Sequence, residues 1–78
     1  MRKLYEIAEE IHKDWKPVNF AAVPYLTAML TMDNVKEDFG YDSGKSIVLY
    51  FLSNASTWRG DTARRIKKEL NDMLKEKP

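Results

Sequence analysis

The sequence predicts an all-α fold: a small antiparallel bundle of four helices plus one short helical turn. Three observations support this prediction. Apolar residues recur at helical spacing in four stretches, which are separated by turn-forming residues. One run of consecutive apolar residues, at 47–52, also fits a buried strand, but no second run offers it a partner. The chain has 78 residues and no cysteine, so a single core held by packing must stabilise it. We therefore expect residues 1–78 to form one helical domain.

The first helix is predicted from an apolar stripe near the start of the chain. The stripe follows the spacing i, i+3, i+4, i+7 and i+11, with charged residues outside it: Leu4, Ile7, Ala8, Ile11 and Trp15. Pro17 limits this helix, because proline lacks an amide donor and pushes the preceding residue out of the helical conformation.

The second helix is predicted at residues 20–32. Asn19 can cap it, and Pro24 is compatible with it only in the first turn. Its expected apolar stripe comprises Ala22, Val23, Leu26, Met29 and Leu30.

A single helical turn is predicted next, at residues 35–39. Asn34 followed by Glu37 has the spacing of a capping box, and Gly40 ends the turn. The following residues, Tyr41-Asp42-Ser43-Gly44, form a turn-rich stretch that can cap another helix.

The third helix is predicted at residues 43–54. Its apolar positions also match a helical stripe, which consists of Ile47, Val48, Phe51, Leu52 and Ala55. Because this stretch is the most apolar of the four, we expect it to be the innermost helix of the bundle.

The last helix is predicted to run to about residue 75, with an apolar stripe at Ala63, Ile66, Leu70, Met73 and Leu74. Its start is open, since Ser56, Thr57 and Asp61 are all suitable caps. Trp58 therefore lies either in its first turn or in the preceding loop.

The sequence contains no pattern typical of an enzyme. Gly44-Lys45-Ser46 resembles part of a phosphate-binding loop, but the glycine required five residues earlier is replaced by Phe39. His12 is the only histidine, so it is the only imidazole that could act as a base for a serine nucleophile. Because cysteine is absent, a transition-metal site would have to consist of this one histidine and carboxylates. We expect no catalytic residue, no cofactor and no metal site.

The charges are distributed unevenly. Residues 1–56 carry six basic and eight acidic side chains, whereas residues 57–78 carry seven basic and four acidic ones. A tryptophan beside this basic segment suggests a recognition patch, composed of Trp58, Arg59, Arg64, Arg65 and Lys68. In one alternative, Trp58 closes the end of the bundle while Arg59 pairs with an acidic residue of the first helix. In another, the last helix enters a DNA groove as part of a helix-turn-helix.

The sequence predicts a cytoplasmic protein. The N-terminal residues turn acidic at once and lack the apolar stretch of a signal peptide. The longest apolar-rich segment, residues 20–30, is too short to span a bilayer. We expect no contact with a membrane.

Three runs of residues carry a resemblance: Phe20-Ala-Ala-Val-Pro24-Tyr-Leu, the stretch from Gly40 to Ala55, and Ser56-Thr-Trp-Arg-Gly-Asp-Thr-Ala-Arg-Arg. Together they resemble small uncharacterised proteins encoded by prophages, plasmids and other mobile elements of Gram-positive bacteria. The resemblance implies a regulator and no established activity. We therefore expect a non-enzymatic protein-interaction or regulatory module that binds another protein or itself. The alternative is a nucleic-acid-binding protein that uses its basic C-terminal helix.

Overall fold

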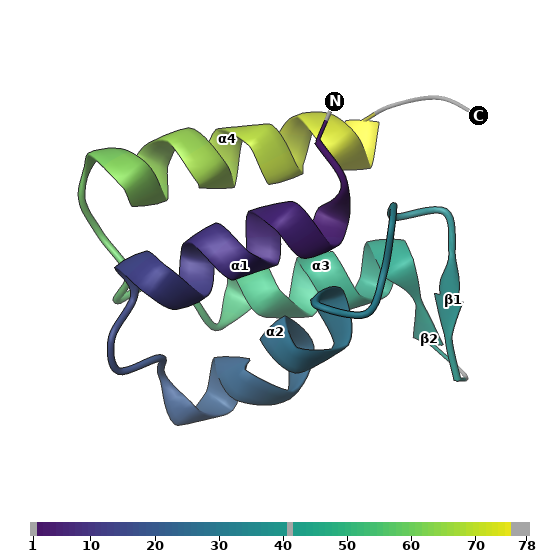
Figure 1. Ribbon diagram of the computed structural model, residues 1–78, viewed down its shortest axis with the longest axis horizontal. Coiled ribbons are helices and arrows are strands. Elements are labelled where there is room, and N and C mark those ends of the chain that lie inside the picture. The colour runs from purple at the N-terminus through teal and green to yellow at the C-terminus, as the bar shows by residue number, and fades with distance from the viewer. Residues whose placement is uncertain (1, 41, 76–78) are drawn as a thin grey trace.

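The computed structural model describes residues 2–40 and 42–75. Along the chain, the elements are α1 (Leu4–Asp14), η1 (Phe20–Ala22), α2 (Val23–Met29), β1 (Asp38–Phe39), β2 (Asp42–Ser43), α3 (Gly44–Ser53) and α4 (Asp61–Lys75). Here η1 is a turn of 3-10 helix. Consecutive α-helices alternate in direction, so helices that follow one another in the chain are antiparallel (Figure 1). The predicted all-α bundle of four helices is confirmed.

The helices form three layers. α1 and α3 occupy the middle, α4 packs against both from one side, and α2 packs against both from the other (Figure 1). The expectation that the third helix is innermost is wrong, because α3 shares the middle layer with α1 and exposes Leu49 and Tyr50.

The core is built from the predicted stripes. Every stripe residue of α1 is buried, and α4 buries all of its stripe except the partly exposed Leu74. Phe51 of α3 is fully buried and meets Trp15 edge-on, with ring centroids 6.2 Å apart. The stripe predicted for the second helix is correct at three of its five positions: Ala22, Leu26 and Met29 are buried, whereas Val23 and Leu30 are exposed.

The start of α2 follows its sequence signals. The Asn19 side chain accepts a hydrogen bond from the backbone N–H of Ala21, as expected of a cap. The chain then makes the 3-10 turn η1 before Pro24 enters the first turn of α2. The α-helix is therefore shorter than the predicted 20–32: the 3-10 turn takes the first three of these residues, and α2 ends at Met29.

The predicted helical turn at 35–39 is wrong. The expected polar contacts do form, since the Glu37 carboxylate accepts from the backbone N–H of Asn34, and the Asn34 side chain accepts from that of Lys36. The chain then extends, however, and β1 pairs with β2 in a minimal antiparallel hairpin. Gly44 reinforces the extended path, because its N–H donates to the carbonyl of Glu37 at 2.6 Å. Tyr41, in the predicted turn-rich stretch, lies outside the described residues.

The start of α4 is now defined. The helix begins at Asp61, so Trp58 and Arg59 belong to the loop between α3 and α4.

In the described part of the chain, no helix is both long and apolar enough to cross a bilayer.

Candidate protein-interaction surface

Trp58 lies in the core. Its side chain is 2% exposed and stacks on Trp15, with ring centroids 5.7 Å apart and planes inclined by 12°. Phe51 meets it edge-on at 6.3 Å. The indole N–H donates to the Asp14 carboxylate at 2.9 Å, which satisfies the one polar atom of the ring. Trp58 therefore closes the end of the bundle, and its predicted role as an exposed anchor of a recognition patch is wrong.

Lys67 fixes the loop that carries Trp58. Its Nζ donates to the carbonyls of Ala55 and Trp58 at 2.8 and 2.7 Å, and it lies 5.9 Å from the centroid of the Trp58 ring. Burial, with a smaller contribution from the positive charge of Arg59, lowers the pKa of Lys67. This cation is therefore directed into the fold and not outward.

The remaining residues of the predicted patch lie on the surface, and acids accompany most of them. Arg64 pairs with Asp61 one turn earlier, and Lys68 pairs with Asp72 one turn later. Arg65 pairs with Glu10 of α1. Arg59 is exposed, and among the described residues it does not form the expected ion pair with an acid of α1.

Glu10 belongs to a network that ties the N-terminal segment to α4. Arg2 donates to both carboxylate oxygens of Glu69, at 2.7 and 3.0 Å, and to Glu10 at 2.8 Å. Hydrogen bonds from Arg65 and Arg2 lower the pKa of Glu10, and those with Glu69 and Glu10 raise the pKa of Arg2. The basic side of α4 is thus largely neutralised within the molecule.

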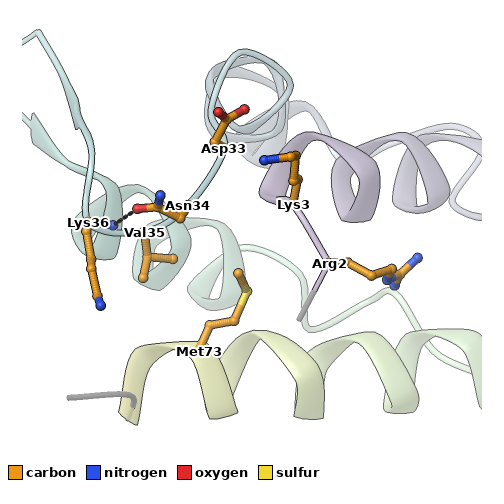
Figure 2. Close-up of a pocket in the computed structure, with 7 residues that line it drawn as sticks. All are labelled: Arg2, Lys3, Asp33, Asn34, Val35, Lys36 and Met73. Atoms are coloured by element: carbon orange, nitrogen blue, oxygen red, sulfur yellow. Dashed lines mark hydrogen bonds between the residues drawn. The ribbon is translucent and has the colours of Figure 1, made fainter. Parts of the chain in front are cut away.

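A cavity of about 330 Å³ opens where the N-terminal segment, the 33–36 turn and α4 meet. Its walls include three cations and one acid, together with apolar groups of Val35 and Met73. Figure 2 shows the side chains of Arg2 and Lys36 extending away from each other, and Arg2 is already held by two glutamates. The charges therefore do not converge on a point where a ligand could be held.

A different surface combines exposed apolar side chains with a complete lack of charge. Residues 17–32 and 46–58 contain no Asp, Glu, Lys, Arg or His, and they supply η1, α2 and most of α3. Large apolar side chains are exposed along these two segments: Phe20, Val23, Leu30, Leu49 and Tyr50. We call the surface formed by the exposed residues of these two segments the uncharged face; the exposed Lys45, at the start of α3, lies outside it.

The two halves of the uncharged face meet along the α2–α3 contact. Tyr25 of α2 lies against Tyr50 of α3, with ring centroids 5.4 Å apart. At the end of the seam, the Asn19 side chain donates to the carbonyl of Asn54 at 3.5 Å. Phe20, next to Asn19, is 91% exposed, and Leu49 is 52% exposed. Exposed apolar side chains therefore lie on the elements at both sides of this contact.

A hollow of about 270 Å³ between α1 and α2 borders the uncharged face. Val18, Val23, Leu26, Thr27 and Leu30 line it, together with His12 of α1. Glu9 and Lys13 lie beside His12 near Leu30, so charged residues begin where the face meets α1. The hollow extends the apolar surface up to this boundary.

Sequence reasoning did not identify the uncharged face. It assigned Val23 and Leu30 to the core and gave no role to Phe20, Leu49 or Tyr50. The available signal was the absence of charge in two stretches that together include η1, α2 and most of α3.

Within the described ranges, no three His, Asp or Glu residues come together as a metal site.

Comparisons with known proteins give no match to a family model, to a curated protein or to a solved structure.

Proposed function

We propose that the protein is a non-enzymatic protein-interaction module and that its uncharged face is the surface through which it binds. The observation that carries this proposal is the exposure of Phe20, Leu49 and Tyr50 on the segments 17–32 and 46–58, which contain no charged residue. The largest apolar patch on a typical monomeric protein covers about 300–600 Å² and is often functional. Aromatic enrichment and depletion of charge are typical of the centre of protein interfaces.

The chemistry of this face fits a protein partner better than a nucleic acid. Nucleic-acid binding draws its affinity from cations that neutralise phosphates, and the uncharged face has none. Five cations lie on α4, where Arg64, Arg65 and Lys68 each pair with a carboxylate of this chain. Phosphate contacts would have to replace those pairs, which weighs against the alternative function.

Photo-crosslinking tests the proposal without requiring a known partner. Benzoylphenylalanine is larger than phenylalanine, but Phe20 is 91% exposed, so the added ring can extend into solvent without disturbing the core. We expect the variant, irradiated in a Gram-positive host, to form adducts that contain protein and survive nuclease. The matched control places the same side chain at the exposed Asn71 of α4.

Adducts at position 20 but not at position 71 support the proposal, whether the captured protein is another species or another copy of this chain. Adducts confined to position 71, or adducts that nuclease removes, overturn it in favour of nucleic-acid binding by α4. Absence of adducts at position 20 in cells that contain the folded variant also overturns it.

A further inference from the structure

We infer that the occupant of the uncharged face is a second copy of this chain, so that the protein forms a symmetric dimer through η1, α2 and α3. The inference rests on the proposed function, because it names the partner of the same surface. Three properties of the molecule support it: the lack of charge on this face, the area of the face, and the charged character of the surface formed by α1 and α4.

The charge of the face suits pairing with itself. In a twofold dimer the same surface contributes from both sides, so a face of one sign would meet its own sign across the axis. Residues 17–32 and 46–58 avoid this repulsion because they contain no ionisable Asp, Glu, Lys, Arg or His. The aromatic rings of Phe20 and Tyr50 supply large apolar area on both copies.

The area of the face approaches what a dimer requires. Its five large apolar side chains are exposed by between 37% and 91%. Side chains of this size offer roughly 500 Å² per protomer when their exposed parts are combined. Neighbouring small residues, Ala21, Pro24, Thr27 and Ser53, are also exposed and widen the contact toward the roughly 800 Å² per partner of a stable interface.

The rest of the surface is poorly suited to the same contact. α1 and α4 present an ion-paired network in which Arg2 and Arg65 engage Glu10, and Arg2 also engages Glu69. Covering these groups would remove charges from water, which carries a large desolvation penalty. The uncharged face can be covered without that penalty.

Analytical ultracentrifugation of the purified protein tests the inference. We expect the wild type to pass from monomer to dimer as its concentration rises from about 1 μM to about 1 mM. Phe20→Glu and Leu49→Glu should each weaken dimerisation by at least about tenfold, because symmetry places two copies of each glutamate in the interface. Asn71→Glu adds the same charge to α4 and should dimerise like the wild type.

Two further measurements distinguish a loss of dimerisation from a loss of folding and locate the interface. Circular dichroism should give the same thermal midpoint for Phe20→Glu and Asn71→Glu under conditions where both are monomeric, since both positions are exposed. Amide chemical shifts of the wild type should change with concentration along η1, α2 and α3. Changes confined to α1 and α4 would overturn the inference, as would a wild type that stays monomeric throughout.

Failure of the inference is distinguishable from failure of the proposed function. A monomeric protein whose position 20 crosslinks to a different protein in cells would refute the dimer and leave the interaction module standing. A monomeric protein without protein adducts at position 20 would refute both.

Discussion

The indole of Trp58 joins parts of the chain that are far apart in sequence. It stacks on Trp15 and bonds to Asp14 at the end of α1, and it meets Phe51 of α3. Lys67 of α4 holds the carbonyl of the same residue. One loop residue thereby links the three helices that surround this end of the core.

We predict that Trp58→Ala lowers the free energy of unfolding by about 3 to 5 kcal/mol, because it removes a large buried aromatic group from a packed cluster. Chemical denaturation would measure the change. The control is the double variant Arg64→Ala, Arg65→Ala, whose exposed ion pairs should contribute no more than about 1 kcal/mol in total. A loss below about 1 kcal/mol for Trp58→Ala would contradict the assigned packing.

At the scale of the element, local patterns predicted the helices but not their exposed sides. The spacing in α1 and α4 identified the core because each helix has one apolar stripe and a charged remainder. α2 has no charged residue, so its sequence could not distinguish the buried Leu26 from the exposed Val23 and Leu30. For the same reason the candidate site was placed on α4, where charges were visible, and the uncharged face was missed.

The hairpin between α2 and α3 shows a second limit of local patterns. Asn34 and Glu37 form the polar contacts that the sequence predicts, and these alone would permit a helical turn. The extended path of β1 depends on its pairing with β2 and on the close approach of Gly44 to the backbone around Val35. These contacts involve strands of two residues each, which are too short to leave a periodic signal in the sequence.

Gly44 permits this approach because it lacks a side chain. A Cβ at this position would lie 2.6 Å from the carbonyl oxygen of Val35 and 2.8 Å from that of Glu37. We predict that Gly44→Ala destabilises the fold by about 1 to 3 kcal/mol through backbone displacement. Lys45→Ala, at the next, exposed position of α3, should change stability by less than about 0.5 kcal/mol in the same denaturation assay. Equal stability of the two variants would show that the hairpin does not constrain α3.

At the scale of the whole molecule, the charged and uncharged residues are segregated. The network of Arg2, Glu10, Glu69 and Arg65 joins the N-terminal segment and α1 to α4, whereas η1, α2 and most of α3 lack charge. Stability on the charged side should therefore depend on pH. Glu10 is the member that accepts from both arginines.

The lowered pKa of Glu10 sets the direction of this dependence. In the unfolded chain a glutamate has a pKa of about 4.3, and in the folded chain the pKa of Glu10 lies below that value. Its contribution is therefore complete above about pH 4.3 and is lost as the pH falls through the lower, folded value. We predict that Glu10→Gln is less stable than the wild type at neutral pH, by up to about 1 kcal/mol, and that the difference shrinks in acid.

Denaturation curves at neutral pH and near pH 3 would measure this difference. The control is Glu9→Gln, which changes an exposed neighbour that forms no ion pair among the described residues. A constant difference between Glu10→Gln and the wild type across this range would contradict the role of the network.

The stacking of Trp15 on Trp58 also has an optical consequence. These are the only two tryptophans of the chain, and both lie at the end of the bundle where α1 ends and α4 begins. Tryptophan fluorescence therefore reports the joining of the first and last helices, and coupling between the stacked indoles adds a signature to the ultraviolet dichroism that disappears when they separate. α2 contains no tryptophan, so unfolding of α2 alone would change helical ellipticity before the emission changed. Coincidence of the two signals would show that both sides of the molecule unfold as one unit.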